Sequence, residues 1–440
     1  MTSTAFTPDA ARALGGPAWL SDRRVAAAER LAALEWPTSS EEIWRYSRVD
    51  DFDLDRYRPS LLPVAAQRVR EDQGQEPAQE VAFGGGPVAA EAGERAGLVV
   101  VRDGRVVHSD LDEALERKGV RVCGIATCEE AEVRQWLGAC SDASPDAFTV
   151  LHDAFLAGGA FVHVPAGVVA ERPIVVLHWA EGDGLASFPH TLVVAEENSE
   201  VTVVDRFSSS ATDHLVDAVV ELHVAEAARV RYLSIQDHGP STWHVALQRA
   251  HVARDASLRS SAVALGGDYA RLRSESLLSG AGAESDLLAV YYGDHGQMLD
   301  FRTLQDHAAP NTRSDLLFKG AVEDHARSVY SGLIHIRESA QKSVAFQTNR
   351  NLVLTEGAGA ESIPNLVIEA NDVKCSHAST VGPIDEEQLY YLESRGVSPE
   401  DAERLIVLGF FDDVFDRLPV PSLVRTLRHA VSDKLGRLHA

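Results

Sequence analysis

The stretch Glu-Asn-Ser-Glu-Val-Thr-Val-Val at residues 197–204 introduces the pattern that decides the fold of this chain. Charged or small residues lead into a short alternating apolar run, and the phrase recurs at residues 226–233, 254–261 and 282–289. The starts are spaced by about 28 residues, which is typical of a solenoid whose units bury their apolar faces only against neighbouring units. The pattern predicts a right-handed parallel β-helix. A β-sandwich, with turns about every 8 to 12 residues, is the alternative.

The repeat occupies the middle of a mainly β chain and divides it into regions. We expect a parallel β-helix core over residues 151–382 and a C-terminal helical module over residues 383–440. Residues 1–150 read as an N-terminal helical and small α/β region. Pro, Gly, Gln and Glu dominate residues 60–97, which is the composition of a flexible linker.

Helix signals are strongest at the two ends of the chain. Ser39 and Glu42 have the spacing of a capping box and predict helix within residues 18–50. Ser398 followed by Pro399 predicts the start of a long C-terminal helix. Further helices are expected over residues 109–118, 128–138, 385–394 and from 421 onward.

The charge of the chain excludes several classes of partner. The formal net charge is −25, from 66 acidic and 41 basic residues, so nucleic acid and anionic membrane surfaces are disfavoured. No apolar run approaches the roughly 20 residues needed to span a bilayer, and the N-terminus lacks a secretory signal pattern. The protein is expected to be cytoplasmic.

The number and spacing of the cysteines, and the absence of common catalytic motifs, limit the reactions that the chain could carry out. Cys123, Cys128, Cys140 and Cys375 are too few for a disulfide scaffold, so reduced thiols are expected, and the spacing of the first three matches no zinc ribbon. Cys123, Cys128 and Cys140 are therefore interpreted as structural residues. The chain has no P-loop, no G-x-S-x-G elbow and no H-E-x-x-H motif. Nucleotide hydrolysis and two common hydrolase mechanisms thus lack sequence support.

The segment from Val373 to His377 is the candidate site. On a strand, Cys375 and His377 point to one face, while Lys374 and Ser376 point to the other. A thiolate and an imidazole suit zinc, copper or iron. Lys374 is expected to lower the pKa of the Cys375 thiol. The alternative is that Cys375 is a plain buried residue of the last coil.

Two motifs resemble the SufB/SufD family of iron–sulfur cluster assembly scaffold subunits. Residues 365–377, Asn-Leu-Val-Ile-Glu-Ala-Asn-Asp-Val-Lys-Cys-Ser-His, with residues 380–385 and 390–396, are similar to its C-terminal signature. Glu-Glu-Ile-Trp-Arg-Tyr at residues 41–46 is similar to its N-terminal E-x-W-x-Y element. The Val-Lys-Cys-Ser-His form, and the lack of cysteine between Cys140 and Cys375, are more similar to the SufD branch.

The resemblance implies a binding function rather than an enzyme. Cys375 and His377 would be metal ligands facing a SufB-type subunit, and the two chains would share a transient iron or iron–sulfur cluster. A cluster normally takes four protein ligands, so the partner would supply the rest. No tightly bound cofactor is expected in the isolated chain, which would self-pair as a homodimer through the same β-helix surface.

A second implied partner is a SufC-type ABC ATPase at the C-terminal helical module. The helix over residues 399–417 carries more apolar residues than one stripe needs. The expected partner-binding residues are Leu405, Leu408, Phe410, Phe411, Val414 and Phe415. Two other functions remain open: a carbohydrate-active β-helix enzyme with paired carboxylates, and a purely structural partner without metal ligands.

Overall fold

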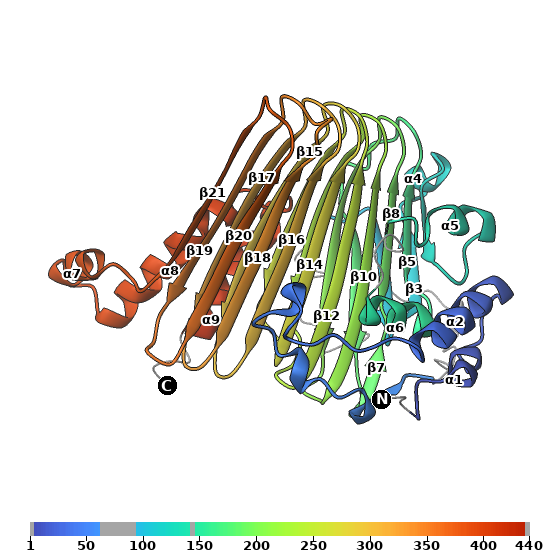
Figure 1. Ribbon diagram of the computed structural model, residues 1–440, viewed down its shortest axis with the longest axis horizontal. Helices are drawn as coiled ribbons and strands as arrows, with labels where there is room; N and C mark the ends of the chain where they lie inside the picture. The colour runs from blue at the N-terminus through green and yellow to red at the C-terminus, as the bar shows by residue number, and fades with distance from the viewer. Residues whose placement is uncertain (1–3, 62–93, 141–145, 436–440) are drawn as a thin grey trace, which may run out of the picture.

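The protein is an elongated two-sheet solenoid with helices at both ends (Figure 1). The computed structural model describes residues 4–61, 94–140 and 146–435. Along the core, consecutive strands alternate between the two sheets, and each strand pairs in parallel with the strand one coil earlier and one coil later. The parallel pairing confirms the predicted β-helix and rules out the β-sandwich alternative.

Sheet A and sheet B are named here by their strands. Sheet A contains β4 (Arg121–Gly124), β5 (Ala160–Val164), β8 (His190–Ala195), β10 (His214–Val224), β12 (Thr242–Val252), β14 (Tyr269–Leu278), β16 (Met298–His307), β18 (Arg327–Ile336) and β20 (Gly359–Ile368), with β1 (Arg58–Pro59) and β7 (Leu185–Ser187) at its side. Sheet B contains β2 (Gly97–Arg102), β3 (Arg105–Leu111), β6 (Ile174–Ala180), β9 (Glu200–Ser209), β11 (Arg229–Gln236), β13 (Ser257–Ala264), β15 (Glu284–Gly293), β17 (Arg313–Val322), β19 (Val344–Val353) and β21 (Lys374–Gly382).

A left-handed turn residue explains the repeated phrase in the sequence. Shortly before each sheet B strand from β9 to β19, one residue has a φ between 53° and 75°. Such a φ lets the chain turn sharply from one sheet into the other, and Asn, Asp and Gly tolerate it best. These residues are Asn198, Ala227, Asp255, Gly282, Asn311 and Lys342.

Side chains inside the solenoid stack in rows, because parallel strands place equivalent residues one above another. One row of sheet B runs from Val201 through Val230, Leu258, Ser285, Ser314 and Ala345, all buried. The next row runs from Val203 through Tyr232, Ser260, Leu287, Leu316 and Gln347, also buried. The interior thus changes from aliphatic toward polar along the solenoid.

The two ends of the solenoid differ. At the N-terminal end, β3 pairs with β2 and β4 pairs with β5, both antiparallel. Strands β2, β3 and β4 therefore continue the solenoid's own sheets, so the predicted small α/β region shares its core. At the other end, β20 and β21 are the last strands of sheets A and B. Their outer edges have no strand partner among the described residues.

The N-terminal helices cover part of the outer face of sheet A. Helices α1 (Pro8–Ala13), α2 (Ala18–Leu31) and α6 (Ala147–Phe155) join a cluster that includes Trp243 and Tyr269 of this sheet. Helices α4 (Glu113–Arg117) and α5 (Glu130–Trp136) are shorter than the predicted 109–118 and 128–138. Helix α4 starts later because β3 extends to Leu111. The expected linker largely lies outside the described residues.

The predicted capping box at Ser39 is wrong. Both the backbone N–H and the hydroxyl of Ser39 donate to Asp50, so Ser39 does not cap a helix. Only short 3-10 turns follow, η1 (Glu42–Trp44), η2 (Val49–Asp51) and η3 (Leu54–Arg56). Trp44 is buried, and the guanidinium of Arg271 lies 3.8 Å above its ring. Tertiary packing on sheet A thus overrides the local helix signal.

The C-terminal helices form as predicted. They are α7 (Glu386–Ser394), α8 (Pro399–Phe415) and α9 (Pro421–Leu435). Ser398 caps α8, accepting from the N–H of Asp401 at 3.2 Å. Helices α8 and α9 pack on the outer face of sheet B, whereas α7 has no buried residue and projects from the end of the solenoid (Figure 1). Among the described residues, no helix is long and apolar enough to cross a membrane.

Candidate functional site

Cys375 and His377 lie on β21, at the open end of the solenoid (Figure 1). Cys375 is in register with Ala345 and His377 with Gln347, and both of those residues are buried. The thiol and the imidazole therefore continue the two interior rows of sheet B. Positions that are internal in earlier coils become accessible here because no described strand covers them.

The environment of Cys375 differs from the one expected. Its side chain is half-buried beside Val373 in a small cluster with Ile334 and Ala345. Burial raises the pKa of the Cys375 thiol, so the prediction that Lys374 lowers it is wrong. Lys374 occupies the alternate position of the strand and is exposed to solvent, which screens its charge. The free thiol is thus protonated near neutral pH.

A buried amide lies directly below His377. Gln347 is 1% exposed, and neither its side-chain nitrogen nor its oxygen has a hydrogen-bond partner among the described residues. Buried polar groups are normally paired, so Gln347 lacks the partners that such a side chain usually has. No third Cys, His, Asp or Glu among the described residues joins Cys375 and His377 into a group of three potential ligands. The pair is therefore a partial donor set.

Apolar side chains surround this open end. Phe346, Val367, Ile368 and Val381 are each more than 40% exposed. They stand on β19, β20 and β21, next to strand edges whose N–H and C=O groups lack strand partners. Exposed apolar side chains beside an open strand edge are typical of an interaction surface. We call these four residues the end patch.

The predicted partner-binding residues of α8 fall into two groups. Phe411, Val414 and Phe415 are fully buried against the outer face of sheet B. Leu405 is 53% exposed, and Leu408 and Phe410 are half-buried. On α7, Tyr390 and Tyr391 are 74% and 57% exposed. The accessible apolar surface of the module is thus formed by Leu405 together with the two tyrosines.

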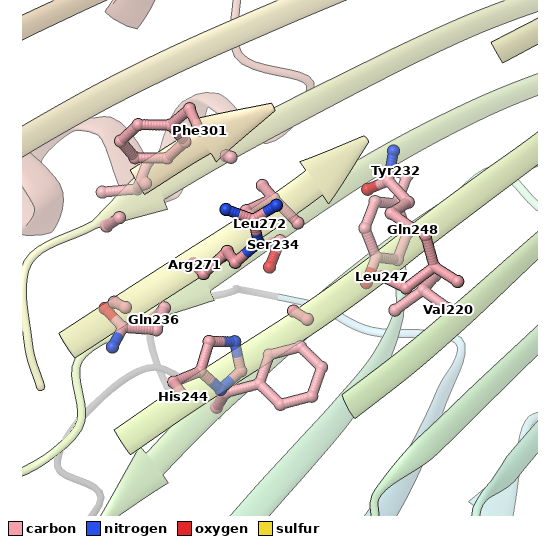
Figure 2. A pocket seen from close by; sticks show the side chains of 16 residues that line it. Val220, Tyr232, Ser234, Gln236, His244, Leu247, Gln248, Arg271, Leu272 and Phe301 are labelled. Carbon is pink, nitrogen blue, oxygen red and sulfur yellow. The ribbon is translucent and has the colours of Figure 1, made fainter. Parts of the chain in front are cut away.

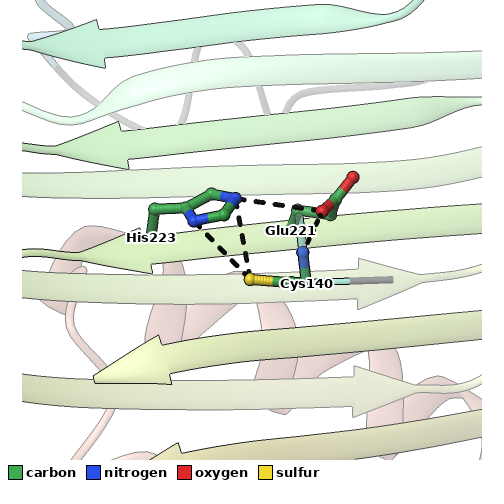
Figure 3. A group of neighbouring side chains, drawn as sticks. All are labelled: Cys140, Glu221 and His223. Atoms are coloured by element: carbon green, nitrogen blue, oxygen red, sulfur yellow. Dashed lines mark hydrogen bonds and ion pairs between the residues drawn. The ribbon is translucent and has the colours of Figure 1, made fainter. Parts of the chain in front are cut away.

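The cysteines of the N-terminal region are not equivalent. Cys123 and Cys128 are joined by a disulfide across a turn, with a Cα–Cα distance of 6.0 Å, so the expectation of reduced thiols is wrong for this pair. Cys140 is free and lies beside Glu221 and His223, as Figure 3 shows. This group was not predictable from the sequence, because Cys140 is some 80 positions away from the other two. The alternation of Glu221 and His223 on one strand face was the only local signal.

A cavity inside the solenoid, shown in Figure 2, is too small for a substrate. It measures about 30 Å³, which is room for roughly one or two water molecules. Tyr232, His244, Gln248, Arg271 and Phe301 are among the lining residues. The cavity is a packing defect between polar and apolar rows rather than a binding site for a sugar.

Comparison with known proteins adds to the geometry of the open end. Residues 178–410 match the family model described as the SufBD core domain of the SUF system for FeS cluster assembly. The chain belongs to the SufBD family. The match covers the solenoid from β6 onward, Cys375 and His377 included, and reaches into α8.

Individual members of the SufBD family are similar over large parts of the chain. The iron–sulfur cluster assembly SufBD family protein Rv1462 of Mycobacterium tuberculosis is 38% identical over 274 residues, covering 60% of this chain and 68% of the relative. The SufD protein of Bacillus subtilis is 28% identical over 429 residues, covering 95% of this chain and 94% of the relative. This SufBD family protein is thus a homologue of SufD along nearly its whole length.

Proposed function

We propose that this chain is a SufD-type scaffold subunit that pairs with a SufB-type subunit through the open end of its solenoid. The observation that carries the proposal is the position of Cys375 and His377 at the end of two interior rows, where the donor set is partial. A second solenoid placed there would complete the coil, cover the end patch and add the missing ligands. The cargo is a transient iron or iron–sulfur cluster held between the two chains.

Self-pairing and location complete this part of the proposal. Without its partner, the chain covers the same end patch against a second copy and forms a homodimer. The proposed location is the cytoplasm, and no cofactor stays tightly bound to the isolated chain. In this function the chain binds and positions, and it carries out no turnover itself.

The energy source is proposed to be a SufC-type ATPase that docks on the C-terminal module. Leu405, Tyr390 and Tyr391 support this proposal, because they remain exposed after Phe411, Val414 and Phe415 are used to attach α8 to sheet B. Exposed tyrosines are frequent anchors of protein interfaces. The replacement Leu405→Asp is expected to remove the ATPase from the purified complex, whereas Leu34→Asp, at an exposed leucine far along the chain, leaves it bound.

The decisive experiment is anaerobic co-expression with the SufB-type and SufC-type subunits. Cys375→Ala and His377→Ala are expected to lower the iron and sulfide retained per complex while the three subunits still co-purify. Lys374→Ala and Ser376→Ala, at the alternate positions of β21, are the matched controls and should retain wild-type content.

Two results would contradict the proposal. If the His377→Ala and Cys375→Ala complexes retained as much iron and sulfide as the wild-type complex, the chain would be a purely structural partner. Turnover of a polysaccharide by the purified chain would favour the carbohydrate-active alternative, whose paired carboxylates would then have to be found on the solenoid surface.

A further inference from the structure

The geometry points to a second metal site, in which Cys140, Glu221 and His223 bind one divalent transition-metal ion of the zinc and ferrous-iron class. The thiol, carboxylate and imidazole atoms all lie within 4.8 Å of one another. This combination of one sulfur, one oxygen and one nitrogen donor suits borderline cations. The site shares no residue with Cys375 and His377 and stands independently of the proposed scaffold function.

Two structural elements bring the ligands together. Glu221 and His223 are two positions apart on β10, so both project from the outer face of sheet A. Cys140 arrives from the turn after α5. The N–H groups of Gly138 and Cys140 donate to the two oxygens of Glu221 at 2.8 and 2.9 Å, which fixes the turn against the strand. The carboxylate and the thiol are therefore held in place before any ion binds.

The distances match those between ligands of a tetrahedral ion. Bond lengths of about 2.3 Å to sulfur and about 2.0 Å to nitrogen and oxygen place sulfur and nitrogen about 3.6 Å apart, and nitrogen and oxygen about 3.3 Å apart. The Sγ of Cys140 lies 3.6 Å from the Nε2 of His223, and that nitrogen lies 3.8 Å from the Oε2 of Glu221. These two separations lie within about 0.5 Å of the values for a tetrahedral ion. Figure 3 shows the sulfur of Cys140 and the carboxylate of Glu221 both facing the ring of His223.

The charges also balance. Glu221 is fully buried. One carboxylate and one thiolate neutralise a divalent ion, with neutral His223 as the third ligand. Binding replaces the thiol proton of Cys140, which is released to solvent. A buried ion neutralised in this way avoids the cost of an uncompensated buried charge.

A chain of histidines orients Glu221 from behind. His152 Nδ1 lies 2.9 Å from the carbonyl of Asp217, so this nitrogen must be the donor and Nε2 the acceptor. His190 Nδ1 lies 3.1 Å from His152 Nε2, and His190 Nε2 lies 3.2 Å from Glu221 Oε1. Metal ligands are commonly oriented by such hydrogen-bonded partners, and losing one typically weakens affinity by roughly 10- to 100-fold.

The environment leaves one coordination position for solvent. The ring of Trp136 lies 5.0 Å from the ring of His223 and shields it on one side. His251 is the register neighbour of His223 on β12, and its side chain is exposed. Arg249 is engaged with Glu275 and with the carbonyl of Cys140. Three protein ligands beside an exposed edge are typical of an open metal site rather than a closed structural one.

The test is an anaerobic titration of the purified full-length chain with Co²⁺, in a reductant that does not bind the metal. Wild type is expected to bind one equivalent and to show thiolate-to-cobalt charge-transfer absorption. Cys140→Ser and His223→Gln are expected to lose both signals, and His190→Gln to weaken binding by roughly 10- to 100-fold. His295→Gln, at an exposed histidine outside both sites, is the matched control and should leave the titration unchanged.

The possible outcomes separate this site from the scaffold site. Absence of stoichiometric binding by wild type, or binding that persists in Cys140→Ser and His223→Gln, would overturn the proposal. Loss of the absorption in Cys375→Ala but not in Cys140→Ser would assign the metal to the open end instead. Should Cys140→Ser fail to fold by circular dichroism, His223→Gln decides, because it leaves the contacts of Glu221 with Gly138 and Cys140 in place.

Discussion

The ammonium group of Lys434, near the end of α9, lies 3.0 Å from the carboxylate of Asp294, in the turn between β15 and β16. Both side chains are less than 10% exposed. The ammonium also donates to the backbone carbonyl of Tyr292 at 3.1 Å and to the amide oxygen of Gln297 at 2.7 Å. This buried ion pair therefore attaches the C-terminal helices to sheet B.

Replacing Lys434 by Met is expected to detach α9. Removal of one partner of a buried ion pair typically costs about 3 to 5 kcal/mol, because the other charge is left uncompensated. Hydrogen exchange should become faster throughout α8 and α9 and stay unchanged in the solenoid strands. Lys118→Met, at an exposed lysine, is the control. Unchanged protection of α9 would show that its apolar contacts suffice.

Mild acid is expected to destabilise the solenoid through His307. Its ring nitrogens lie 2.8 Å from the hydroxyls of Thr312 and Ser314, and burial lowers its pKa from 6.5 to about 4. The unfolded chain therefore binds a proton more readily than the folded one, so stability is lost as the pH falls from 6.5 toward 4. The loss at pH 4 and below is about 3 kcal/mol for this group.

The variant His307→Gln tests this pH dependence. Its thermal midpoint should fall less between pH 6.5 and 4 than the wild-type midpoint, although it starts lower at pH 7. His295→Gln is the matched control, since the His295 side chain is 71% exposed. Parallel pH profiles for wild type and His307→Gln would contradict the assignment.

Two glycines are expected to respond oppositely to alanine. A Cβ on Gly320 would lie 1.9 Å from the ring of Tyr291, one coil away in sheet B, so Gly320→Ala should destabilise by about 1 to 3 kcal/mol or more. A Cβ on Gly409 in α8 meets no atom within 4 Å, and Gly409→Ala should stabilise by about 0.5 to 1 kcal/mol. The midpoints of denaturant unfolding measure both changes. An unchanged midpoint for Gly320→Ala would contradict the close packing of this position against the Tyr291 ring.

Charge placed in the end patch is expected to prevent self-pairing. In Ile368→Lys, an ammonium group replaces an exposed apolar side chain beside the open edge of β20, so the proposed homodimer should dissociate. Sedimentation velocity measures the change. Val169→Lys introduces the same charge at a similarly exposed apolar residue near the opposite end of the solenoid. If the dimer persisted in Ile368→Lys and dissociated in Val169→Lys, the interface would lie near Val169 instead of the end patch.

The fold was predictable because the residues that form the repeated turns can be recognised in the local sequence. Each coil needs a residue that tolerates a left-handed φ, and Asn198, Asp255 and Asn311 are recognisable from sequence alone. The C-terminal helices were equally local, since Ser398 and Pro399 mark the start of α8. By contrast, Ser39 has the spacing of a helix cap but binds Asp50 instead, a tertiary contact that the local pattern does not contain.

The site was predictable only in part, for the same reason. Cys375 and His377 are neighbours on one strand, so their alternation could be read directly. The burial of Phe411 and Phe415 against sheet B could not, because an apolar helix looks alike whether it covers its own sheet or a partner. Cys140 meets Glu221 and His223 only through the path of the turn after α5. Long-range contacts of this kind need the folded chain.

The unequal ends of the solenoid have a consequence for stoichiometry. The antiparallel strands β3 and β4 are the last strands at one end, whereas β20 and β21, with the exposed end patch beside them, are the last strands at the other. A solenoid that carries the end patch at one end only can join a single neighbour through it. The joined pair then has no second end patch to offer. In the proposed pairing, growth into a filament, the usual hazard of stacked parallel strands, would therefore stop at two chains.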